Sequence, residues 1–143
     1  MISLVLIGHS PELLDALRAM VAQAAPAVPV TTAGGTLAGN LGTSSPGIQA
    51  AILVGLAASA GDGVVVLFDL GSAAMALEMA LEELSPADRA LVAVSDGPLV
   101  EGAVRAAVEA AGGSDREQVR AAADAERLAR KLPPDWLAAA RDA

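Results

Sequence analysis

The chain has 143 residues, of which 54% are hydrophobic but only 1% aromatic, and it carries a net charge of −8. This length suits one domain with its own core, and the lack of cysteine excludes disulfides, a thiol nucleophile and a thiolate metal site. The acidic balance argues against nucleic acid as a partner, because no basic patch is present to neutralise phosphates.

The first predicted element is the apolar run Ile2–Ile7, which is typical of a parallel strand covered on both faces. It is too short for a signal peptide or a membrane span, and no long apolar run follows, so we expect a soluble, cytoplasmic protein with no membrane contact. Ser10 and Pro11 then provide an N-cap and a proline at the first helical position. Helical spacing predicts an inward-facing stripe of Leu13, Leu17, Met20, Val21 and Ala24.

A second strand is predicted over Val28–Thr32, and a loop rich in glycine and threonine follows it at residues 33–45. Loops of this length are usually either functional or disordered. Pro46 opens a second helix, whose stripe of Ile48, Ile52 and Leu56 is predicted to face inward.

The third strand, Val64–Phe68, leads through a loop at residues 69–72 into a helix over Ala73–Leu84. The fourth strand, Leu91–Val94, leads through a loop at residues 95–98 into a helix over Leu99–Ala111. The apolar positions of the first of these helices are Met75, Leu77, Met79 and Leu81. We interpret the two methionines as core residues rather than as contacts with a partner. An apolar patch there could also form a partner surface or a dimer seam. The predicted stripe of the second is Val100, Val104, Ala107, Val108 and Ala111. The segment Pro98–Ala103 has a structural interpretation as well as a functional one: Pro98 as the proline at the first helical position, with Val100 and Ala103 in the core.

The last predicted helix starts at a capping box, Ser114 with Glu117, and extends to about Lys131. Its apolar positions are few, so we expect it on the surface; they are Val119, Ala122, Ala129 and Leu132. Pro133 and Pro134 end it. We therefore expect one domain over residues 1–132 and a C-terminal tail over residues 133–143.

Four strand–helix repeats predict an α/β fold, an open, doubly wound parallel sheet with helices on both faces. In such sheets the ligand-binding side chains come from the loops after the carboxyl ends of the strands. Here those loops hold many hydroxyl groups, and their backbone N–H groups lie near helix N-termini, which suits an anion.

His9, the only histidine, stands in the first of these loops. A histidine can exchange a proton, hold a metal or carry a phosphoryl group, and Asp69 is placed to orient it. The chain lacks a G-x-G-x-x-G turn, a P-loop lysine, enough ligands for a metal site, and the G-x-S-x-G elbow of a Ser-His-Asp hydrolase. Ser10 is better explained as a helix cap. Two interpretations of His9 therefore stay open: a phosphoryl acceptor, and a polar residue that happens to lie in a loop.

Four motifs, in order, resemble the phosphotransferase subunit of dihydroxyacetone kinase, which belongs with the mannose-type enzyme IIA domains of the phosphoenolpyruvate-dependent phosphotransferase system. They are Gly8-His9-Ser10, Leu41–Ser44, Asp69–Ala73 and Pro98–Ala103. The resemblance runs to about residue 130. It implies a homodimer and a four-stranded sheet in the order 2-1-3-4, which places His9 and Asp69 on adjacent strands.

The resemblance further implies a phosphoryl relay. His9 would accept a phosphoryl group from the histidine phosphocarrier protein and pass it to ADP on the nucleotide-binding subunit of the kinase, which phosphorylates dihydroxyacetone. Asp69 would orient His9, and no permanently bound cofactor or metal is expected. The residues expected to bind the phosphoryl group are Ser10, Gly42, Thr43, Gly71 and Ser72.

Two departures from the family pattern are visible. Gly8 stands where many relatives carry serine, and no phosphocarrier domain follows, so we expect phosphoryl groups to come from a separate protein. Two other functions stay open: a mannose-type enzyme IIA of a sugar transporter, and a non-catalytic regulator that senses phosphorylation. The motifs at residues 69–72 and 98–103 favour the kinase relay.

Overall fold

Four parallel strands form one sheet in the order β2-β1-β3-β4 in the computed structural model, which describes residues 1–142. The strands are β1 (Ser3–Gly8), β2 (Val30–Gly34), β3 (Val64–Phe68) and β4 (Val92–Val94). The parallel register pairs Gly8 with Gly34 and Ile7 with Phe68, so β1 lies in the middle of the sheet with a neighbour on each side. The predicted α/β class, the parallel sheet and the order 2-1-3-4 are confirmed.

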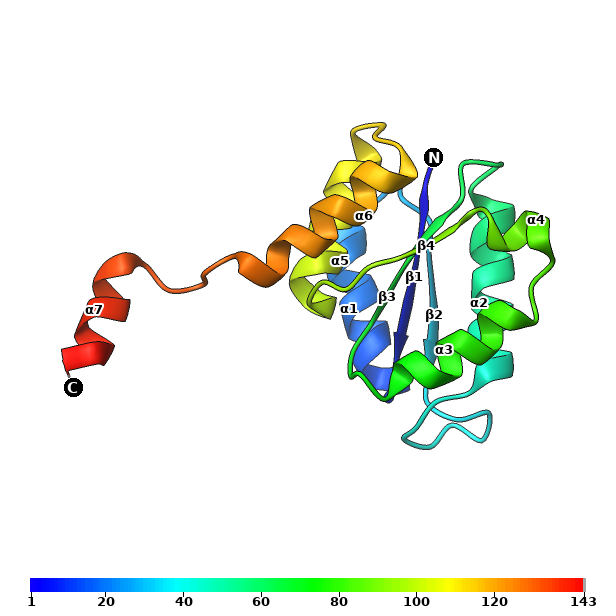
Figure 1. The fold of residues 1–143 in the computed structure, drawn as a ribbon, viewed down its shortest axis with the longest axis horizontal. Helices are drawn as coiled ribbons and strands as arrows, with labels where there is room; N and C mark the ends of the chain where they lie inside the picture. The colour runs from blue at the N-terminus through cyan, green and yellow to red at the C-terminus, as the bar shows by residue number, and fades with distance from the viewer. Residues whose placement is uncertain (143) are drawn as a thin grey trace.

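Helices cover both faces of this sheet (Figure 1). On one side lie α1 (Pro11–Ala24), α5 (Leu99–Ala111) and α6 (Arg116–Ala125), and on the other α2 (Ser45–Ala58), α3 (Ala73–Glu82) and the short α4 (Pro86–Arg89). A 3-10 turn, η1 (Glu126–Leu128), extends α6, and α7 (Pro134–Asp142) stands away from the other helices. None of the helices within residues 1–142 has the length and apolar character needed to cross a bilayer.

The core has two halves because the side chains of a strand alternate between the faces of the sheet. Leu4 and Leu6 of β1 pack toward α1 and α5, whereas Val5 and Ile7 pack toward α2 and α3. All four side chains are fully buried. A strand covered on both faces must be apolar at every position, which explains the unbroken run that opens the chain.

The buried faces of two helices differ from the predicted stripes. In α1 the buried residues are Leu14, Leu17 and Val21, whereas Leu13 and Met20 are 45% and 52% exposed. Ala24 is also exposed. In α5 the buried face consists mainly of alanines, and Val100, Val108 and Ala111 lie outside it. In a chain this rich in apolar residues, several stripes are available to each helix, and contact with the sheet selects among them.

The prediction that Met75 and Met79 belong to the core is wrong. Ala73, Leu77 and Ala80 form the buried face of α3, and the two methionines on its outer side are 74% and 59% exposed. Met75 and Met79 are each two residues from the buried Leu77, so the helical turn places them on the opposite side of α3 from the core.

Several boundaries also differ from the predictions. The second strand begins two residues later than expected, Pro98 is an N-cap rather than the first residue of α5, and α4 was not predicted. α6 begins with a capping box of Asp115 and Gln118, because the Ser114 hydroxyl donates instead to Glu109 (2.6 Å), and α6 ends at Ala125. The tail contains α7, and the domain boundary after residue 132 stays a prediction.

Candidate functional site

The carboxyl ends of β1 and β3 lie side by side, and they bring His9 next to Asp69. The His9 N–H donates to Asp69 Oδ2 at 2.8 Å, and the ring Nδ1 lies 2.9 Å from Asp69 Oδ1. The Leu70 N–H donates to the same Oδ1 at 2.7 Å. One carboxylate therefore fixes both the backbone and the imidazole of His9.

The charge state of Asp69 determines which ring nitrogen of His9 is available. Burial acts to raise the pKa of Asp69, but hydrogen bonds from the His9 N–H, the Leu70 N–H and the imidazole outweigh burial, so the pKa lies below its usual value. The carboxylate is thus ionised near neutral pH, and the proton of a neutral His9 ring belongs on Nδ1. Nε2 then carries the lone pair, and the side chain is 27% exposed to solvent.

Ser72 faces this free nitrogen. Its Oγ lies 3.1 Å from His9 Nε2, where the hydroxyl can donate to the lone pair. Ser72 is also the N-cap residue of α3. The Ala73 and Ala74 N–H groups donate to the carbonyl oxygens of Leu70 and Gly71, so the helix acts on this site through its dipole rather than through these two N–H groups. The positive end of the helix dipole therefore lies beside Nε2, an arrangement that favours an anion.

Gly42 supports His9 from the loop between β2 and α2. Its N–H donates to the His9 carbonyl oxygen at 2.9 Å, with φ of 140°. A Cβ here would lie 2.9 Å from the Thr36 side chain, so both the backbone angle and the space require glycine. This loop is thus joined to the site by a backbone hydrogen bond.

Three other predicted residues have weaker links to His9. The Ser10 hydroxyl accepts from the Leu13 N–H (3.2 Å) and donates to Glu12, so it serves as the cap of α1. No hydrogen bond joins Thr43 to His9 within residues 1–142. Gly71 has open space where a Cβ would stand, and nothing around it requires glycine. Their phosphoryl-binding roles stay predictions.

Gly8 contributes to the site in a way that sequence reasoning missed. A Cβ at Gly8 would lie 3.0 Å from Asp69 Oδ2 and 3.3 Å from Leu14 Cδ2. Glycine therefore leaves the space that the carboxylate occupies when it binds the His9 N–H. In the sequence, the only indication of this role was that Gly8 stands where many members of the family that the chain resembles carry serine.

Comparison with known proteins identifies the family of this chain. Residues 3–120 match the model of the EIIA-man family, described as the PTS system fructose IIA component. The chain belongs to the EIIA-man family. The resemblance stated from the sequence is thereby confirmed.

Curated relatives cover nearly the whole domain of this EIIA-man chain. One is the PEP-dependent dihydroxyacetone kinase 2 phosphoryl donor subunit DhaM of Listeria innocua, 32% identical over 83% of this chain and 94% of the relative. Another is the PTS-dependent dihydroxyacetone kinase phosphotransferase subunit DhaM of Lactococcus lactis, 32% identical over 82% and 89%. A crystal structure of a protein of unknown function, EF1359, superposes with a TM-score of 0.73 and 31% identity over 87% of this chain and 94% of that one.

Proposed function

We propose that this chain is the phosphoryl-relay subunit of a phosphoenolpyruvate-dependent dihydroxyacetone kinase, with His9 Nε2 as the phosphoryl carrier. One observation carries the proposal: Asp69 occupies Nδ1, whereas Nε2 is turned toward Ser72 and the N-terminus of α3. The names of the relatives support the choice of kinase.

The proposed transfer needs no proton to enter or leave the ring. The lone pair of Nε2 attacks the phosphorus of a phosphohistidine on the donor; the new N–P bond forms as the donor's N–P bond breaks. The His9 ring becomes cationic, and the Asp69 carboxylate offsets this charge through Nδ1–H. The Ser72 hydroxyl, displaced from Nε2, can then donate to a phosphoryl oxygen. Catalysis of this kind consists mainly of positioning and charge stabilisation.

The partners follow from two half-reactions. In the first, the histidine phosphocarrier protein would donate the phosphoryl group to His9. In the second, ADP on the nucleotide-binding subunit of the kinase would accept it, which breaks the Nε2–P bond and forms ATP. The chain would act as a cytoplasmic homodimer that holds no resident cofactor, only the phosphoryl group itself.

Intact-mass measurement after incubation with phosphoenolpyruvate, enzyme I and the phosphocarrier protein tests the first half-reaction. We expect the wild-type chain to gain the mass of one acid-labile phosphoryl group. His9→Ala should gain none while keeping its fold, because Nε2 is the only acceptor proposed. A mass gain in His9→Ala, or none in the wild type with an active carrier, would refute the assignment.

Discharge of the phosphorylated chain tests the second half-reaction. Loss of the group to an ADP-loaded kinase subunit, with ATP formed, supports the kinase relay. The description of the family, the PTS system fructose IIA component, favours a second candidate, an enzyme IIA of a sugar transporter. Discharge to a transporter subunit alone would select that candidate.

A further inference from the structure

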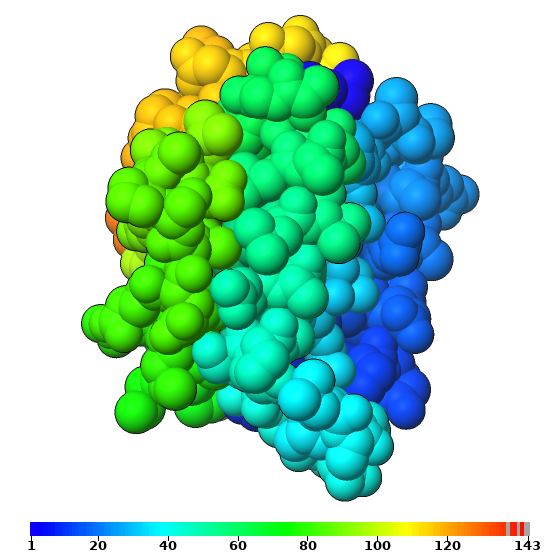
Figure 2. Space-filling model, turned by 90° about the vertical axis from the view of Figure 1, so that its right-hand side faces the viewer, coloured from blue at the N-terminus to red at the C-terminus, as the bar shows by residue number. Residues whose placement is uncertain are grey.

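The loop between β2 and α2, residues 35–42, stands out from the body of the molecule. Figure 2 shows this loop in cyan as a projection at the lower edge, and residues 37–41 are all exposed. Leu37 and Leu41 are 77% and 76% exposed. Because these residues have little to pack against, the hydrogen bonds within the loop must hold its shape.

Both ends of this loop bind the backbone of the segment that carries His9. The Gly35 N–H donates to the Gly8 carbonyl oxygen at 3.1 Å, and the Gly42 N–H donates to the His9 carbonyl oxygen at 2.9 Å. The two acceptors belong to neighbouring residues, so the chain has to fold back on itself between the two donors. The shape of this fold-back therefore determines where the Gly42 N–H points.

Thr36 holds the fold-back together. Its N–H donates to the Asn40 carbonyl oxygen at 2.9 Å, and its Oγ1 accepts from the Asn40 N–H at 3.2 Å. Its carbonyl oxygen accepts from the Gly39 N–H at 2.9 Å. A Cβ at Gly35 would lie 2.4 Å from the Asn40 carbonyl oxygen, so the loop closes tightly at this point. The Thr36 methyl group borders Gly42, where a Cβ would lie 2.9 Å from it. One side chain thus fastens Asn40 and borders Gly42.

We propose that Thr36 is a positioning residue for phosphoryl transfer, which acts on His9 through Asn40 and Gly42. Its hydroxyl holds the Asn40 N–H, and the turn so formed directs the Gly42 N–H at the His9 carbonyl oxygen. Asp69 already accepts from the His9 N–H, so the peptide groups on both sides of His9 are fixed and the ring keeps its direction. The effect on the rate of transfer rests on the proposed function, whereas the effect on the His9 backbone does not.

The chemistry of the transfer makes the placement of the ring important. Nε2 has to face the phosphorus in line with the breaking bond, and an error of about 1 Å can cost roughly 100-fold in rate. The Ser72 hydroxyl, which lies 3.1 Å from Nε2, has to move aside as the phosphorus approaches. The ring is then held by Asp69 at Nδ1 and by its own backbone, so a loose His9 carbonyl group would remove one of two supports.

Thr36→Val and Thr31→Val form a matched pair of variants. Thr36→Val keeps the methyl group but removes the acceptor of the Asn40 N–H. Thr31→Val removes a hydroxyl that donates to the Ala51 carbonyl oxygen at 2.9 Å, a bond between β2 and α2 outside the loop. We expect Thr36→Val to lower the saturating rate of transfer from the phosphocarrier protein about tenfold, with an unchanged half-saturating carrier concentration. Thr31→Val should transfer at the wild-type rate, and so should Thr36→Ser, which keeps the hydroxyl.

Hydrogen exchange at the Gly42 amide tests the same inference without phosphoryl transfer. This amide should exchange about tenfold or more faster in Thr36→Val than in the wild type, Thr31→Val or Thr36→Ser. Unchanged exchange in Thr36→Val would overturn the proposal, and so would an unchanged rate of transfer or an equal slowing by either of the other variants. A wild type that accepts no phosphoryl group from an active carrier would refute the proposed function instead, and the exchange at Gly42 would then decide whether Thr36 holds the His9 backbone.

Discussion

At the scale of single residues, the site depends on one carboxylate with three donors. Asp69→Asn keeps the shape of the side chain but loses the charge that offsets a cationic ring and fixes the proton on Nδ1. We expect phosphoryl transfer to His9 to slow by about 10–100-fold, the range found when a carboxylate that orients a metal-bound histidine is removed. Rapid-quench measurement of transfer from the phosphocarrier protein would check this, and an unchanged rate would exclude the orienting role.

The same carboxylate makes stability depend on pH. Because the pKa of Asp69 is lower in the folded than in the unfolded state, the unfolded chain binds more protons as the solution becomes acidic. The stabilisation is complete at neutral pH and is lost as the pH falls from about 5 through the folded-state pKa. In urea unfolding at pH 7 and pH 3, the wild type should therefore lose more stability than Asp69→Asn. Equal losses would show that the hydrogen bonds to Asp69 do not stabilise the fold.

Gly8 and Gly71 form a matched pair for a steric test. Gly8→Ala places a Cβ 3.0 Å from Asp69 Oδ2, whereas Gly71→Ala places one in open space. We expect Gly8→Ala to destabilise the protein by about 1–3 kcal/mol through overpacking and to slow transfer to His9 by displacing Asp69. Gly71→Ala should change stability by less than about 0.5 kcal/mol. Equal effects in urea unfolding would contradict the account of Gly8.

The central pair of the site could be predicted from the sequence because strand ends can be identified there. His9 and Asp69 each follow an apolar run, and the strand order implied by the family resemblance makes them neighbours. The role of Gly8 could not be predicted, since it depends on how closely Asp69 approaches β1. Ser10 and Ser72 both place a hydroxyl in a loop of the site, so the sequence does not distinguish them. The structure shows that Ser72 faces Nε2 and that Ser10 caps a helix.

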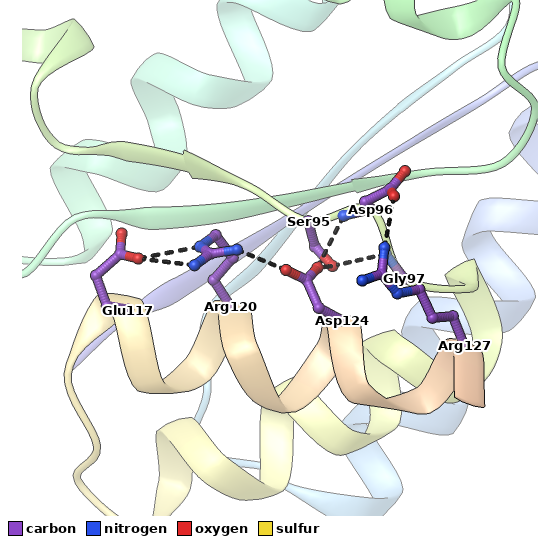
Figure 3. A network of polar contacts seen from close by, with 7 residues as sticks. All are labelled: Ser95, Asp96, Gly97, Glu117, Arg120, Asp124 and Arg127. Atoms are coloured by element: carbon purple, nitrogen blue, oxygen red, sulfur yellow. Dashed lines mark hydrogen bonds and ion pairs between the residues drawn. The ribbon is translucent and has the colours of Figure 1, made fainter. Parts of the chain in front are cut away.

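At the scale of elements, a polar network fastens α6 to the loop after β4 (Figure 3). Asp124 Oδ1 accepts from the buried Ser95 hydroxyl at 2.6 Å and from the Asp96 N–H at 2.8 Å, and Asp124 Oδ2 accepts from Arg120. A Cβ on Gly97 would lie 2.2 Å from the Ala123 carbonyl oxygen, so α6 and the loop are in direct contact.

Asp124→Ala should therefore loosen α6. It leaves the buried Ser95 hydroxyl and the Asp96 N–H without their acceptor, which we expect to cost about 1–3 kcal/mol. Glu117→Ala removes only the ion pair between an exposed carboxylate and the partly exposed Arg120, and should cost less than about 1 kcal/mol. Urea unfolding compares the two variants. A smaller loss for Asp124→Ala than for Glu117→Ala would show that the network does not hold α6.

The helices show what a sequence pattern leaves undecided. Two overlapping residue pairs fit the capping-box pattern at the start of α6: Ser114 with Glu117, and Asp115 with Gln118. The second pair forms the box, because the Ser114 hydroxyl donates to Glu109 instead. In α1, Leu13 and Leu14 offer two overlapping apolar stripes, and packing against the sheet selects Leu14. The pattern predicts the helices themselves, because caps and prolines mark where they begin.

At the scale of the whole molecule, the two halves of the core draw their residues from positions 2–123. Removal of residues 133–143 leaves every one of these contacts in place, together with the ion pair between Lys131 and Glu101. We therefore expect the shortened chain, measured at high dilution, to unfold in urea within about 0.5 kcal/mol of the full chain. A larger loss would place α7 within the folding unit and move the predicted domain boundary beyond residue 132.

The same truncation tests whether the site needs the C-terminal segment. His9 and Asp69 lie on loops that the truncation leaves intact, and the bond between His9 Nδ1 and Asp69 Oδ1 involves no residue beyond position 132. If the predicted domain over residues 1–132 holds the whole site, the shortened chain should gain the proposed phosphoryl group at the wild-type rate in the intact-mass assay, and a slower gain would show that residues 133–143 contribute to the site.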